Sequence, residues 1–173
     1  MITLNIAVAS TGNLASLNGR IKSAAENAEK DAAKTLRSAT AKYVASQYWL
    51  TQSIVRQHTH TVPGGIRVSS ERLSLDKYKL SPKTAHSKRH LKAAVKRNNS
   101  LKPLGKTAFI RTISGTGLPF ARLGKSRLPI KKLIGPAIPQ LVDNPNVIEL
   151  IQEEGTRTFS KRFQHYMARS GGK

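Results

Sequence analysis

Residues 118–142 read LPFARLGKSRLPIKKLIGPAIPQLV, and this stretch decides the fold of the region around it. Its prolines fix the backbone φ angle and remove hydrogen-bond donors, so no helix can run through it. We expect two short strands, 119–123 and 128–132, joined by the turn GKSR at 124–127. We expect the chain to leave the β structure abruptly at 135–136. The residues that set this course form a structural signature: Pro129, Gly135, Pro136 and Pro139.

The run FARLGKSRLPIKKLIGPAIPQ, residues 120–140, also resembles the signature of a known family. That family is the prophage minor tail protein Z, or tail-completion, family of long-tailed phages. In it, a strand and a basic turn lead to an arginine or lysine, then Pro-Ile, then Gly-Pro-x-x-Pro and a closing helix. The order here matches without a gap, and the match is most specific at GPAIP, residues 135–139.

The resemblance implies a structural virion protein, not an enzyme, that completes the tail and joins it to the head at the neck. It implies a homo-oligomeric, sixfold ring between the tail tube or its terminator and the head connector or adaptor proteins. The protein would be made in the host cytoplasm and end in the virion. A basic surface in such a ring would face a neighbouring ring or make non-specific contact with phage DNA. We assign five residues to that interface: Arg122, Lys125, Arg127, Lys131 and Lys132.

Charge supports a partner of opposite sign. The chain has 30 Lys and Arg against 9 Asp and Glu, a formal net charge of +21. Residues 77–142 contain sixteen Lys and Arg and no acidic residue. Because such a charge repels itself, an acidic or polyanionic partner is expected. Charge alone also fits a second hypothesis, a cytoplasmic nucleic-acid-binding protein of ribosomal or nucleoid type with a disordered basic arm at 81–106.

Length and composition favour a single domain with a modest core. A chain of 173 residues can bury about 70% of its unfolded surface. With no cysteine, neither a disulfide framework nor a cysteine zinc site can form. The start MITLNIAVAS lacks the pattern of a secretory signal, and no apolar window is long enough for a membrane span, so no membrane partner is expected.

The N-terminal part, residues 1–57, predicts one strand and two helices. Apolar residues alternate from Ile2 to Val8, which indicates a strand. Apolar residues then recur three or four apart over 14–46, which predicts a long helix with an alanine stripe suited to a close neighbour. Thr51 can cap a short second helix ending near 57. Trp49, the only tryptophan, is interpreted as an anchor at the helix junction in preference to a base-stacking platform.

Residues 58–142 predict a basic β region. We expect paired strands at 66–70 and 72–77, an exposed, flexible arm within 81–106, a short strand near 91–95 and a further strand at 107–113. The C-terminal part, 143–173, predicts a helix that begins with Asn144 as its cap and Pro145 as its first residue. Gly155 within that helix predicts a close crossing. The fold class is therefore α+β: two terminal helices packed on a small, mainly antiparallel sheet with a long basic loop.

No motif supports catalysis, a cofactor or a metal. The sequence GKS at 124–126 resembles the end of a phosphate-binding loop, but Pro119 stands where its first glycine belongs and no helix can start at Ser126. The carboxylates lie mostly in the two terminal helices and form no acid and base pair. The histidines lack cysteine or carboxylate neighbours to complete a metal shell, and are assigned to the basic surface: His58, His60, His86, His90 and His165.

Overall fold

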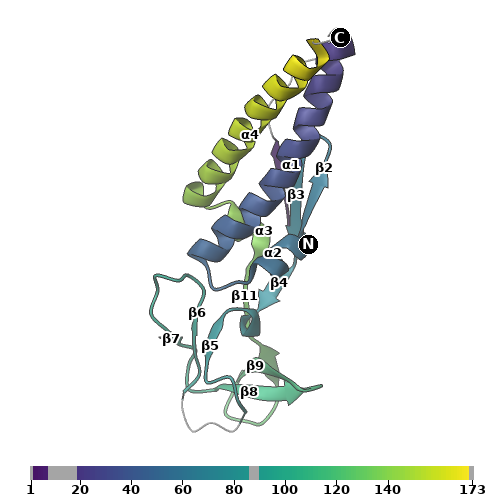
Figure 1. Ribbon diagram of the computed structural model, residues 1–173. Helices are drawn as coiled ribbons and strands as arrows, with labels where there is room; N and C mark the ends of the chain where they lie inside the picture. Colours follow the sequence, from purple (N-terminus) through teal and green to yellow (C-terminus); the bar gives the residue numbers. More distant parts are fainter. Residues whose placement is uncertain (1, 8–18, 86–89, 172–173) are drawn as a thin grey trace.

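Two long antiparallel helices, with one small sheet beside them, form one end of the molecule, and the other short antiparallel strands form the rest (Figure 1). The computed structural model describes residues 2–7, 19–85 and 90–171. The two helices are α1 (Gly19–Gln47) and α4 (Pro145–Gly171). The mixture of helices and antiparallel sheets confirms the expected α+β class. No helix in the described part of the chain is long and apolar enough to cross a bilayer.

The buried face of helix α1 consists mainly of small residues. Eight of its eleven buried residues are alanines, and a fully buried Leu36 lies among them. Small side chains let another helix approach closely, and α4 does so at Gly155. A β-carbon at Gly155 would lie only 2.7 Å from Leu36 Cδ2, so the predicted close crossing is confirmed. The predicted start of this helix near residue 14 lies outside the described residues.

Helix α4 begins as its sequence predicts. The Asn146 N–H donates to Asn144 Oδ1 at 3.2 Å, so Asn144 is the N-cap and Pro145 the first helical residue. The Asn144 side chain also donates to the Tyr48 hydroxyl at 2.9 Å, which ties the start of α4 to the end of α1. Val147 and Ile151 are buried in the core, and the helix, which the sequence predicts to end near residue 169, continues to residue 171.

A three-stranded antiparallel sheet lies against α1. Its order is β1 (Ile2–Ala7), β3 (Gly65–Ser70), β2 (Thr59–Val62), and Ile66 and Val68 of the central strand are fully buried. The sequence predicted β1 and β3 but missed β2, whose hairpin turn uses Gly64 at φ +81°. The short helix α2 (Gln52–Gln57) precedes β2, with Thr51 at the N-cap position but no side-chain capping bond.

A two-stranded ribbon, β4 (Arg72–Ser74) with β11 (Ile134–Ala137), joins the two ends of the molecule. The predicted pairing of 66–70 with 72–77 is wrong, because β3 already has β1 and β2 as neighbours and residues Leu75–Lys77 form the 3-10 turn η2. The sharp exit expected at 135–136 is also wrong. Both residues belong to β11, which pairs with β4 alone among the described strands, and the register shifts within it.

The signature residues hold this ribbon in place. A β-carbon at Gly135 would lie 2.7 Å from Tyr78 Cε2, so only glycine allows the buried tyrosine ring to pack there. The Tyr78 hydroxyl donates to the Pro136 carbonyl at 2.8 Å. Pro139 lies at the start of the short helix α3 (Ile138–Val142), and its carbonyl accepts the Asp143 N–H at 2.9 Å.

Residues expected to form a flexible arm instead contribute a second small sheet. Its order is β5 (Lys79–Ser81), β6 (Lys92–Ala94), β7 (Lys102–Pro103). Leu91 and Ala93 are buried in the core, so an exposed arm does not include them, whereas residues 96–100 are exposed. The expected short strand near 91–95 is confirmed. His86, Lys88 and the rest of 86–89 lie outside the described residues.

A third sheet, β10-β9-β8, forms the far end of the molecule (Figure 1). Its strands are β8 (Ala108–Ile113), β9 (Thr116–Arg122) and β10 (Ile130–Lys132). These agree with the three strands expected at 107–113, 119–123 and 128–132. The turn after β9 is also where the sequence placed it.

A second set of contacts joins the helical end of the molecule to its β end. The backbone N–H of Trp49 donates to the Val95 carbonyl at 2.8 Å, and the backbone N–H of Arg97 donates to the Gln47 carbonyl at 2.9 Å. The Arg97 guanidinium also donates to the Ala45 carbonyl at the end of α1. The Lys79 ammonium and the Arg97 guanidinium lie 4.2 and 4.6 Å from the centre of the Trp49 ring. Trp49 therefore anchors the helix junction, as the sequence predicted.

Candidate functional site

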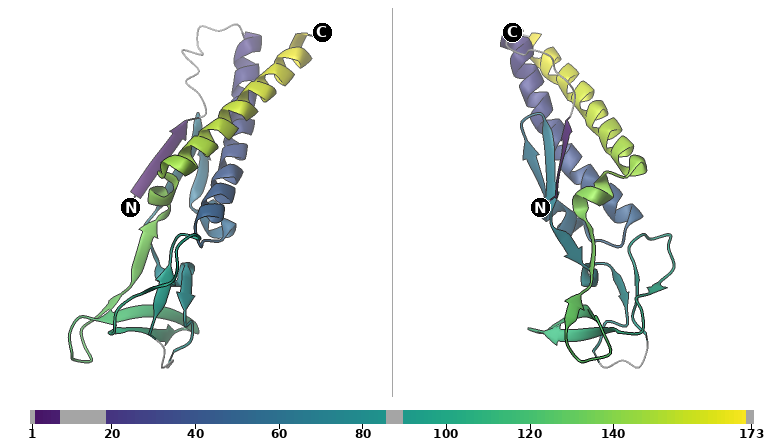
Figure 2. Two further views of the ribbon diagram at one scale, coloured as in Figure 1. Left: turned by 90° about the vertical axis from the view of Figure 1, so that its left-hand side faces the viewer. Right: turned by 180° about the vertical axis from the view of Figure 1, so that it is seen from behind.

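The described parts of segment 77–132, which carry most of the basic residues of 77–142, form the end of the molecule opposite the helix tips (Figure 2). Within the described ranges, Lys77 with Asp76 is the only ion pair that involves a basic residue of this span. The other ion pairs lie on α1 and α4. This end therefore presents positive charge that its own chain leaves unneutralised.

The β9–β10 hairpin carries the five residues assigned from the sequence, and all five are exposed. Arg122 pairs across the strands with Ile130, and Lys132 pairs with Phe120. Because directly opposite residues and residues two apart share a face, Arg122 and Lys132 lie on the same side of the sheet. Lys131, opposite Ala121, points to the other side. The remaining two assigned residues, Lys125 and Arg127, lie in the turn.

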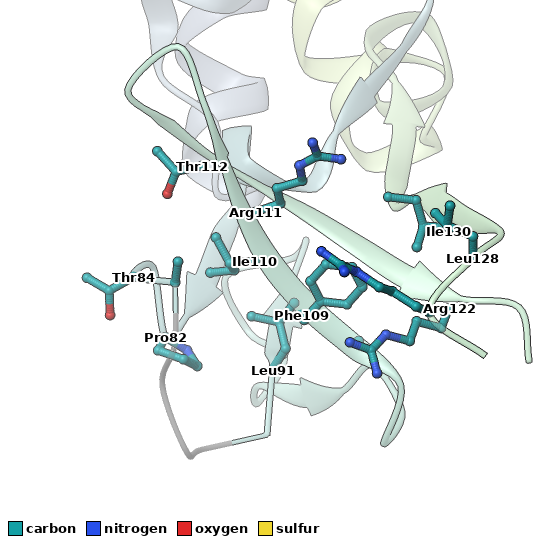
Figure 3. A pocket seen from close by; sticks show the side chains of 13 residues that line it. Pro82, Thr84, Leu91, Phe109, Ile110, Arg111, Thr112, Arg122, Leu128 and Ile130 are labelled. Atoms are coloured by element: carbon teal, nitrogen blue, oxygen red, sulfur yellow. The ribbon is translucent and has the colours of Figure 1, made fainter. Parts of the chain in front are cut away.

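Aromatic rings accompany the basic residues on one face of this sheet. The Phe109 and Phe120 rings stack with centroids 6.2 Å apart, and the Arg122 guanidinium lies 5.4 Å from the Phe109 ring centre. Figure 3 shows Phe109 and Arg122 side by side, with Arg111 on the same strand. We call this the basic-aromatic face, defined by Phe109, Arg111, Phe120, Arg122 and Lys132. Phe109 and Arg111 cannot be joined to the site from the sequence, because only the β8–β9 register brings them there.

A cavity of about 830 Å³ opens beside this face (Figure 3). Its wall combines arginines with apolar side chains, and no carboxylate lines it. Such a lining suits a ligand or protein segment that carries both negative charge and apolar surface. Residues that contribute to the wall include Pro82, Leu91, Phe109, Arg122, Arg127 and Leu128.

The hairpin also exposes two large apolar side chains. Leu123 is 65% exposed and Leu128 is 67% exposed. The Leu123 N–H donates to the Pro129 carbonyl at 3.1 Å, which closes the base of the turn and holds both leucines beside it. We call this element, residues 123–128, the hairpin tip. The sequence predicted both leucines as strand residues and did not identify them as exposed.

The groups weighed for metal binding are not gathered into a site in the described residues, and one carboxylate of the terminal helices, Asp31, has structural contacts. The described chain contains no group of three or more His, Asp and Glu placed to hold a metal ion. Asp31 accepts a hydrogen bond from the Tyr166 hydroxyl at 2.9 Å and lies 3.6 Å from Arg162 Nε, so it links α1 to α4. That hydrogen bond is the main cause that raises the pKa of Tyr166. Residues 124–126 lie in a hairpin turn with no helix after them, unlike a phosphate-binding loop.

Comparisons with protein-family models, with curated proteins and with solved structures gave no match to this chain.

Proposed function

We propose that this chain is a structural phage virion protein that completes the tail and joins it to the head connector as a ring of identical subunits. The observation that carries the proposal is the stretch 118–142. It resembles the tail-completion signature, and in the fold it leads from the exposed basic hairpin through the ribbon to the start of the helical end. One continuous segment thus links a cationic contact surface to the body of the subunit.

Two further features support a protein that functions in contact with other subunits or with DNA. The unneutralised basic end is suited to DNA phosphates or to acidic faces of an adjoining ring. The exposed leucines of the hairpin tip would lose contact with water if another subunit covered them, which favours association. The assigned contact residues are Arg122, Lys125, Arg127, Lys131 and Lys132, with a tail terminator or tube protein on one side and connector or adaptor proteins on the other.

Electron microscopy of particles tests the proposal. Immunogold label against this chain is expected at the junction of head and tail of mature particles. Deletion of the gene is expected to leave full-length tails that do not join capsids. Mature particles without label, or normal joining in the deletion strain, would overturn the proposal.

One observation favours a second candidate, a cytoplasmic nucleic-acid-binding protein. Arg122 stacked on Phe109, beside Phe120, resembles the combination of cations and rings that binds nucleic-acid strands. This candidate cannot rest on an arm that is disordered throughout, since residues 92–94 and 102–103 of the segment 81–106 pair in a sheet. A dedicated binder should bind duplex DNA or RNA tightly as an isolated monomer with a steep salt dependence, whereas a neck subunit should bind weakly before assembly.

A further inference from the structure

The hairpin tip has the chemistry of an inserted element. Leu123 and Leu128 are the most exposed of the large hydrophobic residues described, and Lys125 and Arg127 lie between them in the turn. Two large apolar side chains left in water at one turn, with cations between them in the sequence, are typical of a contact surface. A surface that fits the tip must offer an apolar spot flanked by carboxylates.

The same chain presents such a surface on the outer face of α4. Leu150 is 39% exposed, although Val147 and Ile151 next to it in the helix are fully buried against the core. Glu149 and Glu153 are exposed around Leu150, and neither takes part in any ion pair of the described residues. At 100° per residue, all three side chains project from the side of α4 that faces away from α1.

The tip and this helix face do not meet within one molecule. Figure 2 shows the β9–β10 hairpin at the end of the molecule opposite the helix tips, while α4 runs alongside α1. A contact between the two surfaces therefore requires two copies of the chain. Because the surfaces differ, the contact is heterologous, and each copy keeps a free tip at one side and a free helix face at the other. Repetition of such a contact closes a ring when the rotation between copies allows it.

We propose that the hairpin tip of one copy docks on the face of α4 formed by Glu149, Leu150 and Glu153 in the next copy. Leu128 covers Leu150, while Lys125 and Arg127 lie against the two carboxylates. The charges set partner and orientation, and the leucines supply the buried area. The proposal deepens the proposed function and rests on it for the setting of this contact in a ring.

Disulfide cross-linking tests the contact directly, because the natural chain has no cysteine. The single variants Leu128→Cys and Leu150→Cys are purified separately, treated with nuclease, mixed and mildly oxidised. The mixture is expected to give about tenfold more covalent dimer than a control mixture of Asn99→Cys with Leu150→Cys, since docking raises the local concentration of the two thiols. Dimer yield no higher than in the control, or equal yield from Leu128→Cys alone, would overturn the proposal.

A charge exchange tests specificity. The cross-linked yield is expected to fall about tenfold when the copy that carries Leu128→Cys also carries Lys125→Glu and Arg127→Glu. The same fall is expected when the copy that carries Leu150→Cys also carries Glu149→Lys and Glu153→Lys. Combining the two altered partners is expected to restore the yield to within about threefold of the original. Failure of this restoration would contradict the assigned pairing.

Controls matched in charge separate pairing from net charge. The exposed pair Lys102→Glu and Lys106→Glu changes the net charge by the same amount as the tip variant, and Glu26→Lys with Glu71→Lys matches the α4 variant. Neither is expected to change the yield by more than about twofold. A loss as large as that of the tip or α4 variants would show that bulk charge governs association, which would overturn the proposal.

The outcomes also separate this inference from the proposed function. If the cross-link forms but the chain is absent from particles, the contact stands and the tail function fails. If particles carry the chain at the neck and the Lys125→Glu, Arg127→Glu variant still joins heads to tails, the function stands and the contact fails.

Discussion

The crossing of α1 and α4 at Gly155 allows a quantitative test of how the two helices pack. A β-carbon at this position would lie 2.7 Å from Leu36 Cδ2 and 3.1 Å from Leu36 Cγ. Leu36 is fully buried, so its side chain has no open space to enter. Gly155→Ala gains about 1 kcal/mol of helix propensity, but overpacking a core costs about 1–3 kcal/mol. We expect the variant to be less stable than the wild type by about 1 kcal/mol.

A second substitution should reverse the sign of this effect. Leu36→Ala alone removes the atoms that crowd the new methyl group and leaves a cavity, at a cost of about 2–5 kcal/mol. In that background Gly155→Ala keeps its propensity gain and adds a buried methyl group worth about 0.8 kcal/mol. It should therefore stabilise the Leu36→Ala protein by about 1–2 kcal/mol, a coupling of about 2–3 kcal/mol between the two sites.

Urea unfolding followed by circular dichroism at 222 nm measures all four proteins of the cycle. Gly19→Ala is the matched control, because a β-carbon at Gly19 meets nothing within 4 Å. It should leave the free energy of unfolding unchanged or slightly raised. If Gly155→Ala stabilises the wild type, or if its effect is the same in both backgrounds, the steric account of the crossing is refuted.

Three further predictions concern the ribbon, the start of α4 and the basic end. Tyr78→Phe should cost about 1 kcal/mol through loss of its hydrogen bond to β11. Burial raises the pKa of Tyr78 above its ordinary value of 10.0, so as the pH rises the unfolded chain loses the hydroxyl proton before the folded protein does. The wild type should therefore lose more stability than the variant above pH 10, which urea unfolding measures. Asn144→Ala should lower the free energy of unfolding by about 1–2 kcal/mol, because the helix loses its cap. Arg122→Ala with Lys132→Ala should reduce the slope of log affinity for duplex DNA against log salt by about 2, whereas Arg67→Ala should not change it.

Each of these predictions has an outcome that contradicts it. Equal pH dependence of Tyr78→Phe and the wild type above pH 10 would mean that the tyrosine ring is not buried in the folded state. Asn146→Ala, which keeps the backbone donor to the cap, should change stability far less than Asn144→Ala; equal losses would exclude the capping role. An unchanged salt slope in the double variant would remove the basic-aromatic face from contact with phosphate.

The elements predicted correctly are those whose pattern is local. Alternation in β1 and β8, the cap at Asn144 and the alanine stripe of α1 all depend on neighbours within a few residues. Gly155 predicted the helix crossing because glycine destabilises a helix interior, and close packing of a neighbouring helix accounts for its presence there. The turn after β9 was marked by glycine and bounded by prolines.

The errors arose where partners are distant in sequence. Nothing local distinguishes residues 79–81 or 102–103 from a solvated basic loop, and only pairing with β6 shows them as strands. In the same way, β4 pairs with β11, which lies some sixty residues further along the chain. The candidate site was found through its charge, but its aromatic part required the register that sets Phe109 opposite Phe120. The exposure of Leu128 could not be read from its residue type.

The two ends of the molecule are joined along two separate lines, the β4–β11 ribbon and the contacts of Trp49 and Arg97 with the strand and helix beside them. A single ribbon would act as a hinge, free to bend and twist. Two attachments some distance apart oppose both motions, so a force on the hairpin turns the helical end with it. The molecule therefore behaves as one rigid body, and a contact that fixes the angle of one end would also fix the direction in which the other end points.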